Sequence, residues 1–320
     1  MLLVLLSSMH ANKLPYILSS EALEAKDVYE ILADRTSEID RHLTECGAIL
    51  IRGFGVDSAE KFQRCIDRMS VRASSYVDGN SPRTKISGSI YTSTEYPAEF
   101  RISLHNELSY SHSWPSRLYF CCVVAPQSGG STSIADSRAI LRRISAPTRR
   151  LFEEKGITYV RNLHGGVGTI IGKSWQKTFE TDSRADVEAY CRAGNIKYDW
   201  NTDGGLRLIQ VGPATARHPQ TGDEVWFNQL EQFHPSSNPP EVYEALSAIY
   251  ESPLDMPQYA CFGDGQPVSD DVLAEVRAAM AAESIEFPWE SGDLMIVDNM
   301  LTAHGRSPFV GQRKILVSMS

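Results

Sequence analysis

The chain has 320 residues, of which 42% are hydrophobic and 22% are charged, as is usual for a globular protein. Its 31 basic and 40 acidic residues give a formal net charge of −9, which argues against a nucleic-acid-binding surface, since such surfaces are basic. The apolar start, residues 1–10, is too short to span a bilayer, which needs about 20 residues, and it lacks the basic segment of a signal peptide. The six cysteines form no C-x-x-C pair, which predicts buried thiols in a reducing compartment. We therefore expect a cytoplasmic protein without membrane or nucleic-acid partners, in which residues 1–10 form a strand or dock on the core.

Helices are expected before strands along the chain. Residues 21–45 have a helix-forming composition, and the GAILIRGF that follows predicts a short buried strand. A second helix is predicted over 58–73, with Asp57 or Ser58 as its N-cap. From about residue 85 the pattern changes to strands and turns, and RLYFCCVVAP predicts a buried strand.

The rest of the chain alternates between helical and strand patterns. DSRAILRRISAPTRRLFEEKG predicts a helix interrupted near Pro147, and LRLIQVGPATARHP, EVWFNQ, DLMIVDN and RKILVSM predict strands. This order predicts a mostly β fold with flanking helices, in which two sheets form a jelly-roll, cupin-like core. A Rossmann domain is excluded because no strand–GxGxxG–helix unit is present. We predict one catalytic domain, residues 1–320, with N-terminal helices and an insertion at about 150–210.

The segment LHNELSY, residues 104–110, places a histidine and a glutamate two residues apart. In a strand, residues i and i+2 point to the same face, so His105 and Glu107 are expected to project together while Asn106 points away. An imidazole beside a carboxylate is compatible with half of a metal site, an acid–base pair or a coincidence on the surface. The metal interpretation requires a further ligand from elsewhere in the chain.

Among the other histidines, His304 has the most informative context. It follows GDLMIVDN and precedes GRSPFVGQRKILVSM, which predicts a β-hairpin around the histidine near the mouth of a β barrel. Two histidines and one carboxylate form the facial triad that suits non-haem Fe(II), whereas zinc prefers a tetrahedral site. The remaining histidines are expected in structural or outer hydrogen-bonding roles: His10, His42, His112, His164, His218 and His234.

The open positions of such a triad suit a bidentate 2-oxo acid, whose far carboxylate then needs a cationic partner. Arg313 lies on the strand predicted after His304, and the planar fork of an arginine binds a carboxylate through two parallel hydrogen bonds. Thr132, which follows Gly129 and Gly130, offers a hydroxyl to the same carboxylate. The alternative for Arg313 is a surface position near the C-terminus.

With these residues assembled, the sequence resembles the TauD/TfdA family of Fe(II)/2-oxoglutarate-dependent dioxygenases, and looks most like its SyrP-like branch. The matching stretches are LHNELSYSHSWPSRLYFCCVVAPQSGGSTSIADSR, SWQKTFETDSRADVEAYCRAGNIKYDW, HPQTGDEVWFNQLEQFH and GDLMIVDNMLTAHGRSPFVGQRKILVSM. The resemblance implies a double-stranded β-helix (jelly-roll) core, with His105, Glu107 and His304 as the iron ligands.

The resemblance also implies where the cosubstrate binds. Thr132 and Arg313 match the positions that hold the distal carboxylate of 2-oxoglutarate. Lys314 is an adjacent cation, and because neighbouring residues of a strand face opposite sides, only one of Arg313 and Lys314 is expected to point inward. We expect it to be Arg313.

The implied reaction uses Fe(II), 2-oxoglutarate and O2 to hydroxylate an unactivated C–H bond of an amino acid or amino-acid-derived substrate in specialised metabolism. Halogenation is disfavoured, because Glu107 is a carboxylate where halogenases of this superfamily have Gly or Ala. Desaturation, epoxidation and oxidative cyclisation at the same iron are alternatives, and a non-catalytic jelly-roll binding module and a zinc hydrolase are alternatives of other classes.

The resemblance also implies substrate contacts at three residues in motifs of the branch, Trp114 in HSWP, Arg161 in YVRN and Asn228 in VWFNQ. The alternative for Trp114 is packing in the core, and the alternative for Arg161 is an ion pair with an internal carboxylate. The substrate itself is an amino-acid-like small molecule, free or tethered to a carrier protein. A homo-oligomer is compatible with the sequence.

Overall fold

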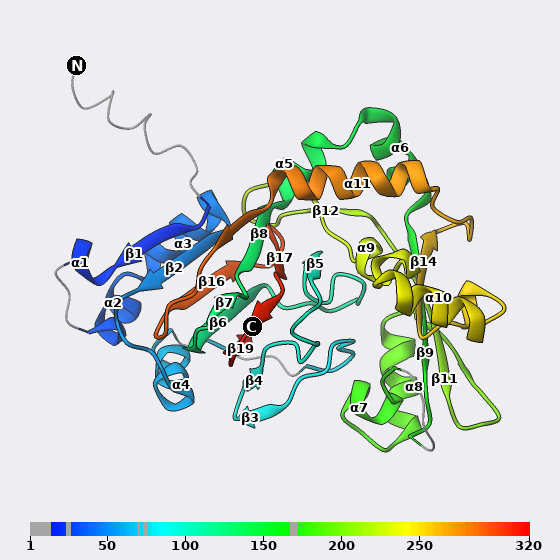
Figure 1. Cartoon of the computed structure of the whole chain (residues 1–320), viewed down its shortest axis with the longest axis horizontal. Helices are drawn as coiled ribbons and strands as arrows, with labels where there is room; N and C mark the ends of the chain where they lie inside the picture. The colour runs from blue at the N-terminus through cyan, green and yellow to red at the C-terminus, as the bar shows by residue number, and fades with distance from the viewer. Residues whose placement is uncertain (1–13, 24–26, 70, 73–75, 167–171) are drawn as a thin grey trace.

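A computed structural model describes residues 14–23, 27–69, 71–72, 76–166 and 172–320 (Figure 1). The apolar start at residues 1–10 lies outside the described residues. Two sheets share one hydrophobic core, and a third sheet lies to one side with helices of its own (Figure 1).

The largest sheet has seven strands, and its central strand β6 is buried on both faces. Leu118, Phe120 and Cys122 point into the core shared with the second sheet, whereas Tyr119 and Cys121 pack with the N-terminal helices. This two-sided burial explains why LYFCCVV, after Arg117, is apolar instead of alternating with polar residues. In spatial order the strands are β1 (Tyr16–Ser19), β2 (Ala48–Arg52), β16 (Leu294–Asp298), β6 (Arg117–Val124), β19 (Lys314–Met319), β4 (Ile90–Thr92) and β3 (Lys85–Ser87).

The second sheet has four strands and carries both histidines of the predicted metal site. In spatial order they are β15 (Ile285–Phe287), β8 (Thr132–Asp136), β17 (Thr302–Arg306) and β5 (Ile102–His105). Strands β17 and β5 are antiparallel, and His304 is the pairing partner of His105. Ile134 of β8 and Ala303 of β17 belong to the same core as Phe120 of β6, so the two sheets pack against each other.

The third sheet has four antiparallel strands and packs with α7 (Trp175–Phe179) and α8 (Arg184–Ala193), at the lower right of Figure 1. Its strands are β10 (Lys197–Trp200), β11 (Leu206–Gly212), β9 (Ile157–Leu163) and β14 (Gln258–Phe262). Two short ribbons pair β12 (Thr215–Arg217) with β13 (Glu224–Trp226), and β18 (Phe309–Val310) with β7 (Ser128–Gly129).

Short helices flank the sheets. Leu32, Leu43 and Phe62 of the N-terminal helices α2, α3 and α4 pack on the outer face of the seven-stranded sheet. The remaining bounds are α1 (Ser20–Leu23), α2 (Val28–Asp34), α3 (Thr36–Cys46), α4 (Ala59–Arg68), α5 (Ser137–Arg143), α6 (Ala146–Lys155), α9 (Leu230–Phe233), α10 (Pro240–Ile249) and α11 (Asp270–Glu283), with 3-10 turns at Pro235–Ser237 and Pro253–Asp255. In the part of the chain that the structure describes, no helix has the length and hydropathy to cross a membrane.

Predicted helix boundaries differ from the structure where a cap or a proline intervenes. The helix predicted over 21–45 is divided into α1, α2 and α3. Ser58, and not Asp57, caps α4, because its Oγ accepts from the Lys61 N–H at 3.2 Å. The helix interrupted near Pro147 is α5 followed by α6, and Pro147 occupies the first turn of α6, where its missing N–H removes no helical hydrogen bond.

The β-hairpin predicted around His304 is wrong. Strand β17, which contains His304, pairs with β8 and β5, whereas the following long strand β19 pairs with β6 and β4 in the other sheet. The chain therefore crosses from one sheet to the other after β17. The local sequence indicates strands and turns, but long-range packing decides which strands pair.

Candidate metal centre

Glu107 is positioned by a turn and not by the strand that ends at His105. Strand β5 ends at His105, Glu107 lies in the turn that follows, and Leu108 has a positive φ of 55°. Asn299 holds this turn, because its Oδ1 accepts from the Glu107 N–H at 2.7 Å and its Nδ2 donates to the Glu107 carbonyl at 2.9 Å. Asn106 donates from its side chain to the Asn299 carbonyl at 2.7 Å. The prediction that one straight strand aims both ligands is therefore wrong, although both side chains reach the same space.

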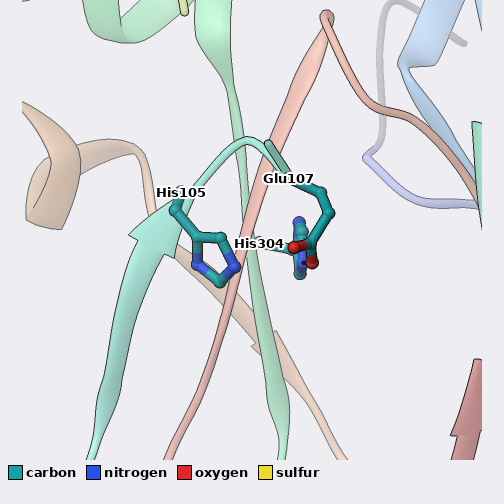
Figure 2. A group of neighbouring side chains, drawn as sticks. All are labelled: His105, Glu107 and His304. Atoms are coloured by element: carbon teal, nitrogen blue, oxygen red, sulfur yellow. Dashed lines mark ion pairs between the residues drawn. The ribbon is translucent and has the colours of Figure 1, made fainter. Parts of the chain in front are cut away.

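The side chains of His105, Glu107 and His304 point toward one another in Figure 2. One ligand atom from each residue lies within 4.8 Å of the others. His304 Nε2 is 4.0 Å from Glu107 Oε2, and the two imidazole centroids are 4.3 Å apart. All three residues are buried. The structure thus brings together the three ligands predicted from sequence, on two paired strands and one turn.

Burial keeps both imidazoles in the neutral form that a metal requires. It lowers the pKa of His105. Burial, with smaller effects of the neighbouring His105 and of the Arg83 cation, lowers the pKa of His304 well below its ordinary value. His105 Nδ1 lies 2.9 Å from the Ser103 carbonyl oxygen and 2.9 Å from Gln232 Nε2. In the tautomer that donates from Nδ1 to Ser103, the lone pair of Nε2 is available to a metal. Two buried neutral imidazoles and one carboxylate are a donor set that fits Fe(II).

Two side chains that the sequence did not indicate hold the Glu107 carboxylate. Arg83 Nη2 donates to Oε2 at 2.5 Å, and the Tyr76 hydroxyl donates to Oε1 at 3.2 Å. Burial raises the pKa of Tyr76 to about 12, so the phenol remains a donor. No motif marks either residue, because each lies in a loop well before β5 and reaches Glu107 only through the fold.

A small cavity adjoins the two histidines, and Thr132 and Arg313 are part of its lining. Arg313 immediately precedes β19, and Lys314, the first residue of that strand, is exposed. The cavity therefore contains the arginine that we expected and leaves the neighbouring lysine outside. Arg313 forms no ion pair with any described residue, as expected for a cation whose anionic partner is a ligand.

Backbone and side-chain hydrogen bonds orient the two residues expected to bind 2-oxoglutarate. Arg313 Nε donates to the Gly130 carbonyl at 2.9 Å. Burial, together with the charge of Arg306, lowers the pKa of Arg313 to about 10, so it remains a cation at neutral pH. Thr132 Oγ1 accepts from the Trp289 indole N–H at 2.9 Å.

Arg161 is occupied by an internal carboxylate. Its Nη2 is 2.6 Å from Asp78 Oδ1, and its Nη1 donates to the Asp78 carbonyl at 3.1 Å. The two side chains are 2% and 0% exposed. Tyr190 also donates to this carboxylate, at 3.2 Å. The structure therefore adopts the alternative in which Arg161 pairs within the protein.

Trp114 and Asn228 do not line the cavity beside the histidines. Trp114 is 40% exposed and packs edge-on against Phe227, with ring centroids 5.2 Å apart. The buried Asn228 side chain stabilises a turn, since its Nδ2 donates to the Ala214 carbonyl at 2.7 Å and its Oδ1 accepts from the Leu230 N–H at 3.0 Å. The geometry thus gives these two residues packing and turn-forming contacts.

Three further histidines have contacts away from the three ligands. His218 Nε2 is 3.1 Å from Asp298 Oδ2, and His112 packs on Tyr190 with ring centroids 4.7 Å apart. His234 caps a 3-10 turn through its side chain. These contacts agree with the structural roles expected from the sequence.

A family model for the taurine catabolism dioxygenase TauD, TfdA family matches residues 11–319. The chain belongs to this family. It is 37% identical over 281 residues to the dapdiamide synthesis protein DdaC of Enterobacter agglomerans. This alignment covers 88% of this chain and 84% of the relative. A clavaminate synthase-like protein of Arabidopsis thaliana is 31% identical over 289 residues, with 88% and 83% covered. The crystal structure of PvcB from Pseudomonas aeruginosa aligns with a TM-score of 0.51 and 16% identity, over 92% of this chain and 81% of that chain.

Membership of the TauD, TfdA family confirms the resemblance seen in the sequence. The chain is a dioxygenase that uses Fe(II), 2-oxoglutarate and O2, which sets aside the non-catalytic module and the zinc hydrolase. At its low identity, the likeness to PvcB supports only the fold, an arrangement of sheets with flanking helices.

Proposed function

We propose that this TauD-family dioxygenase binds Fe(II) through His105, Glu107 and His304, and the distal carboxylate of 2-oxoglutarate through Thr132 and Arg313. One observation carries the proposal. Three buried donor residues converge beside a cavity lined by Arg313, which forms no ion pair with any described residue. His105, His304 and Arg313 come from separate parts of the chain and line one cavity, which supports this proposal.

The residues of this site prepare it for the reaction. When bound, iron with 2-oxoglutarate and O2 supplies oxidative decarboxylation coupled to attack on a substrate C–H bond. The imidazoles of His105 and His304 offer neutral lone pairs, and Glu107 offers a negative charge that Arg83 and Tyr76 orient. The buried setting of the three ligands limits the access of water to the metal position.

We propose hydroxylation of an amino acid or amino-acid-derived substrate in specialised metabolism. The 37% identity to a dapdiamide synthesis protein supports a biosynthetic role. Desaturation, epoxidation and oxidative cyclisation on the same site are the alternatives. Product mass distinguishes addition of oxygen from loss of two hydrogens, and NMR of the product distinguishes an alcohol from an epoxide.

We further propose that the two packed sheets are a double-stranded β-helix core within one catalytic domain, residues 1–320. Strands β9 and β10 and most of β11 lie within residues 150–210. The sheet that they form with β14 packs with α7 and α8 around a hydrophobic cluster of its own, which supports an insertion at about 150–210. All six cysteines are buried and free, which supports a cytoplasmic location. The partner is an amino-acid-like small molecule, free or held on a carrier protein.

Anaerobic titration tests the cofactor assignment. Fe(II) and then 2-oxoglutarate are added to metal-free protein, and the visible charge-transfer band of the chelate is recorded. We expect a band in the wild type, a raised Fe(II) requirement for the band in Glu107→Ala, and a strongly raised 2-oxoglutarate requirement in Arg313→Ala. Lys314→Ala is the matched control, since Lys314 is the exposed neighbour of Arg313. Equal effects of Arg313→Ala and Lys314→Ala would contradict the assignment of Arg313.

A further inference from the structure

Arg83 has buried donors without acceptors beside the metal ligands. Its side chain is 3% exposed, and its Nη2 donates to Glu107 Oε2 at 2.5 Å. The other two nitrogens, Nε and Nη1, are buried and form no hydrogen bond with any described residue. Buried polar groups in folded proteins almost always have hydrogen-bond partners. These two nitrogens therefore need a hydrogen-bond acceptor, and the described part of the chain does not supply one.

A bound metal increases this deficit. The oxygen that accepts from Arg83, Glu107 Oε2, is also the one 4.0 Å from His304 Nε2. A dication among the three ligands shares the negative charge of this carboxylate with Arg83. A buried charge is unfavourable unless it is paired, so a second anion beside Arg83 stabilises the metal-loaded site.

Lys173 brings a second cation to the same place. The Tyr76 ring centroid lies 4.8 Å from Arg83 Cζ and 5.5 Å from Lys173 Nζ. The ammonium donates to the Gly79 carbonyl at 2.7 Å, and a lysine ammonium has further N–H groups to offer. Burial lowers the pKa of Lys173 to about 8, with a smaller contribution from the positive charge of Arg83. The two cations therefore destabilise each other in a setting with too little negative charge.

Arg83 lines two cavities at once. One is the cavity beside His105 and His304. The other is larger, and Tyr91 and Lys173 line it together with Arg83. A molecule in the larger cavity can therefore contact the same guanidinium that lines the cavity beside the two histidines.

The charges around the larger cavity select the class of ligand. Arg83 is buried and Lys173 is partly buried, whereas Glu95 and Glu180, which also line it, are exposed. Exposed carboxylates are screened by water, while buried cations act at low dielectric. The inner part of this cavity therefore favours an anion.

We infer that Arg83, with Lys173, binds a carboxylate of the primary substrate in the larger cavity and holds the substrate next to Glu107. This inference rests on the iron and 2-oxoglutarate site proposed above, and it adds the substrate class, a carboxylic acid. It separates the roles of two arginines: Arg83 binds the substrate, and Arg313 binds the cosubstrate. Arg83 is then a substrate-binding residue in addition to orienting Glu107.

A binding measurement tests this inference without turnover. The protein is loaded anaerobically with Fe(II) and 2-oxoglutarate, and the chelate band is followed while the common L-amino acids and their carboxamides are added. Occupation of the space beside the metal shifts the band. We expect a subset of the acids to shift it, and the matching amides to need about tenfold higher concentration or more, because the amide lacks the charge.

Three variants separate substrate binding from folding and from metal binding. Arg83→Gln is expected to raise the apparent Kd of the responsive acids about tenfold or more, with little change in the Kd of 2-oxoglutarate. Lys173→Gln, whose side chain makes no hydrogen bond to Glu107 in the structure, is expected to weaken the same acids with iron binding unchanged. Arg184→Gln is the control, since Arg184 is exposed and stacks on Trp200 at 4.4 Å.

The other possible results of these titrations contradict either the inference or the proposed function. Equal binding of acids and amides, or no acid that shifts the band, overturns the inference and leaves the cofactor assignment intact. If Arg83→Gln raises the Kd of 2-oxoglutarate as much as that of the acids, Arg83 serves the cosubstrate and the inference is wrong. A wild-type protein that gives no chelate band contradicts the proposed function itself.

Discussion

Asn299 and Glu107 are joined by two hydrogen bonds between one side chain and one backbone unit, at 2.7 Å and 2.9 Å. The same Asn299 amide also donates to the Pro115 carbonyl at 2.8 Å. Asn299 lies in the turn between β16 and β17, so it connects the turn that carries Glu107 to the strand that carries His304. This buried amide therefore fixes the backbone of Glu107 relative to the strand of His304.

Asn299→Ala is expected to lower the free energy of unfolding by about 2–4 kcal/mol and to weaken Fe(II) binding, because buried backbone groups lose their partners. Urea unfolding of the metal-free protein and anaerobic Fe(II) titration measure the two effects. Asn201→Ala, at an exposed position, should stay within about 0.5 kcal/mol of the wild type. Unchanged iron affinity in Asn299→Ala would show that the turn holds its shape without this amide.

Metal-free protein is expected to lose stability in acid because His304 is buried as a neutral imidazole. Burial, with His105 and Arg83, lowers the pKa of His304 well below its ordinary value of 6.5. Below that pH the unfolded chain binds more protons than the folded chain. The stability contributed by neutral His304 is therefore present above about pH 6.5 and is lost as the pH falls, by about 1.4 kcal/mol per pH unit.

The pH prediction is checked by comparing wild type with His304→Gln in the presence of a chelator. The free energy of unfolding is measured in urea from about pH 5 to 8, across the ordinary imidazole pKa. The difference between the two proteins should change with pH below about 6.5 and be constant above it. Parallel curves over the whole range would mean that folded His304 titrates like an exposed histidine.

The ion pair of Arg161 with Asp78 is expected to be structural. Arg161→Met leaves a buried carboxylate without its cation, which should cost about 3–5 kcal/mol of unfolding free energy while the chelate band persists at low temperature. Arg207→Met on β11 is the matched control, because its ion pair with Asp255 is 34% and 51% exposed and should contribute less than about 1 kcal/mol. A stable Arg161→Met protein that no longer responds to substrate would instead place Arg161 in substrate binding.

Thr132 is expected to contribute through its hydroxyl. Because Oγ1 already accepts from Trp289, its own proton is available to a carboxylate in the cavity. Thr132→Val should raise the Kd of 2-oxoglutarate about tenfold and lower stability by about 1 kcal/mol, since the indole N–H loses its acceptor. Thr132→Ser should restore both properties, measured by anaerobic titration and by thermal unfolding. Normal 2-oxoglutarate binding in Thr132→Val would remove Thr132 from the cosubstrate site.

The amino-acid sequence by itself was sufficient to predict the family, three candidate metal-binding residues that lie together in the fold, and much of the local structure. His105, Glu107 and His304 stand out because few residue types bind iron, and the surrounding motifs match the TauD, TfdA family in order. The apolar run that forms β6 and the polar residues before α4, one of which is the Ser58 cap, are patterns within short stretches of the chain. Such short-range signals can be read without knowledge of the fold.

Only the tertiary structure decided how these parts come together. Strands β17 and β19 join different sheets because their partners lie far away in sequence, and no local pattern specifies a partner. The turn that aims Glu107 depends on Asn299, and the guanidinium of Arg83 reaches Glu107 only when its loop packs over β5. Arg161 likewise pairs with Asp78, which is far from it in the sequence, so no local pattern indicates this ion pair. Hydrogen bonds and ion pairs between distant segments form only after the hydrophobic core has brought those segments together.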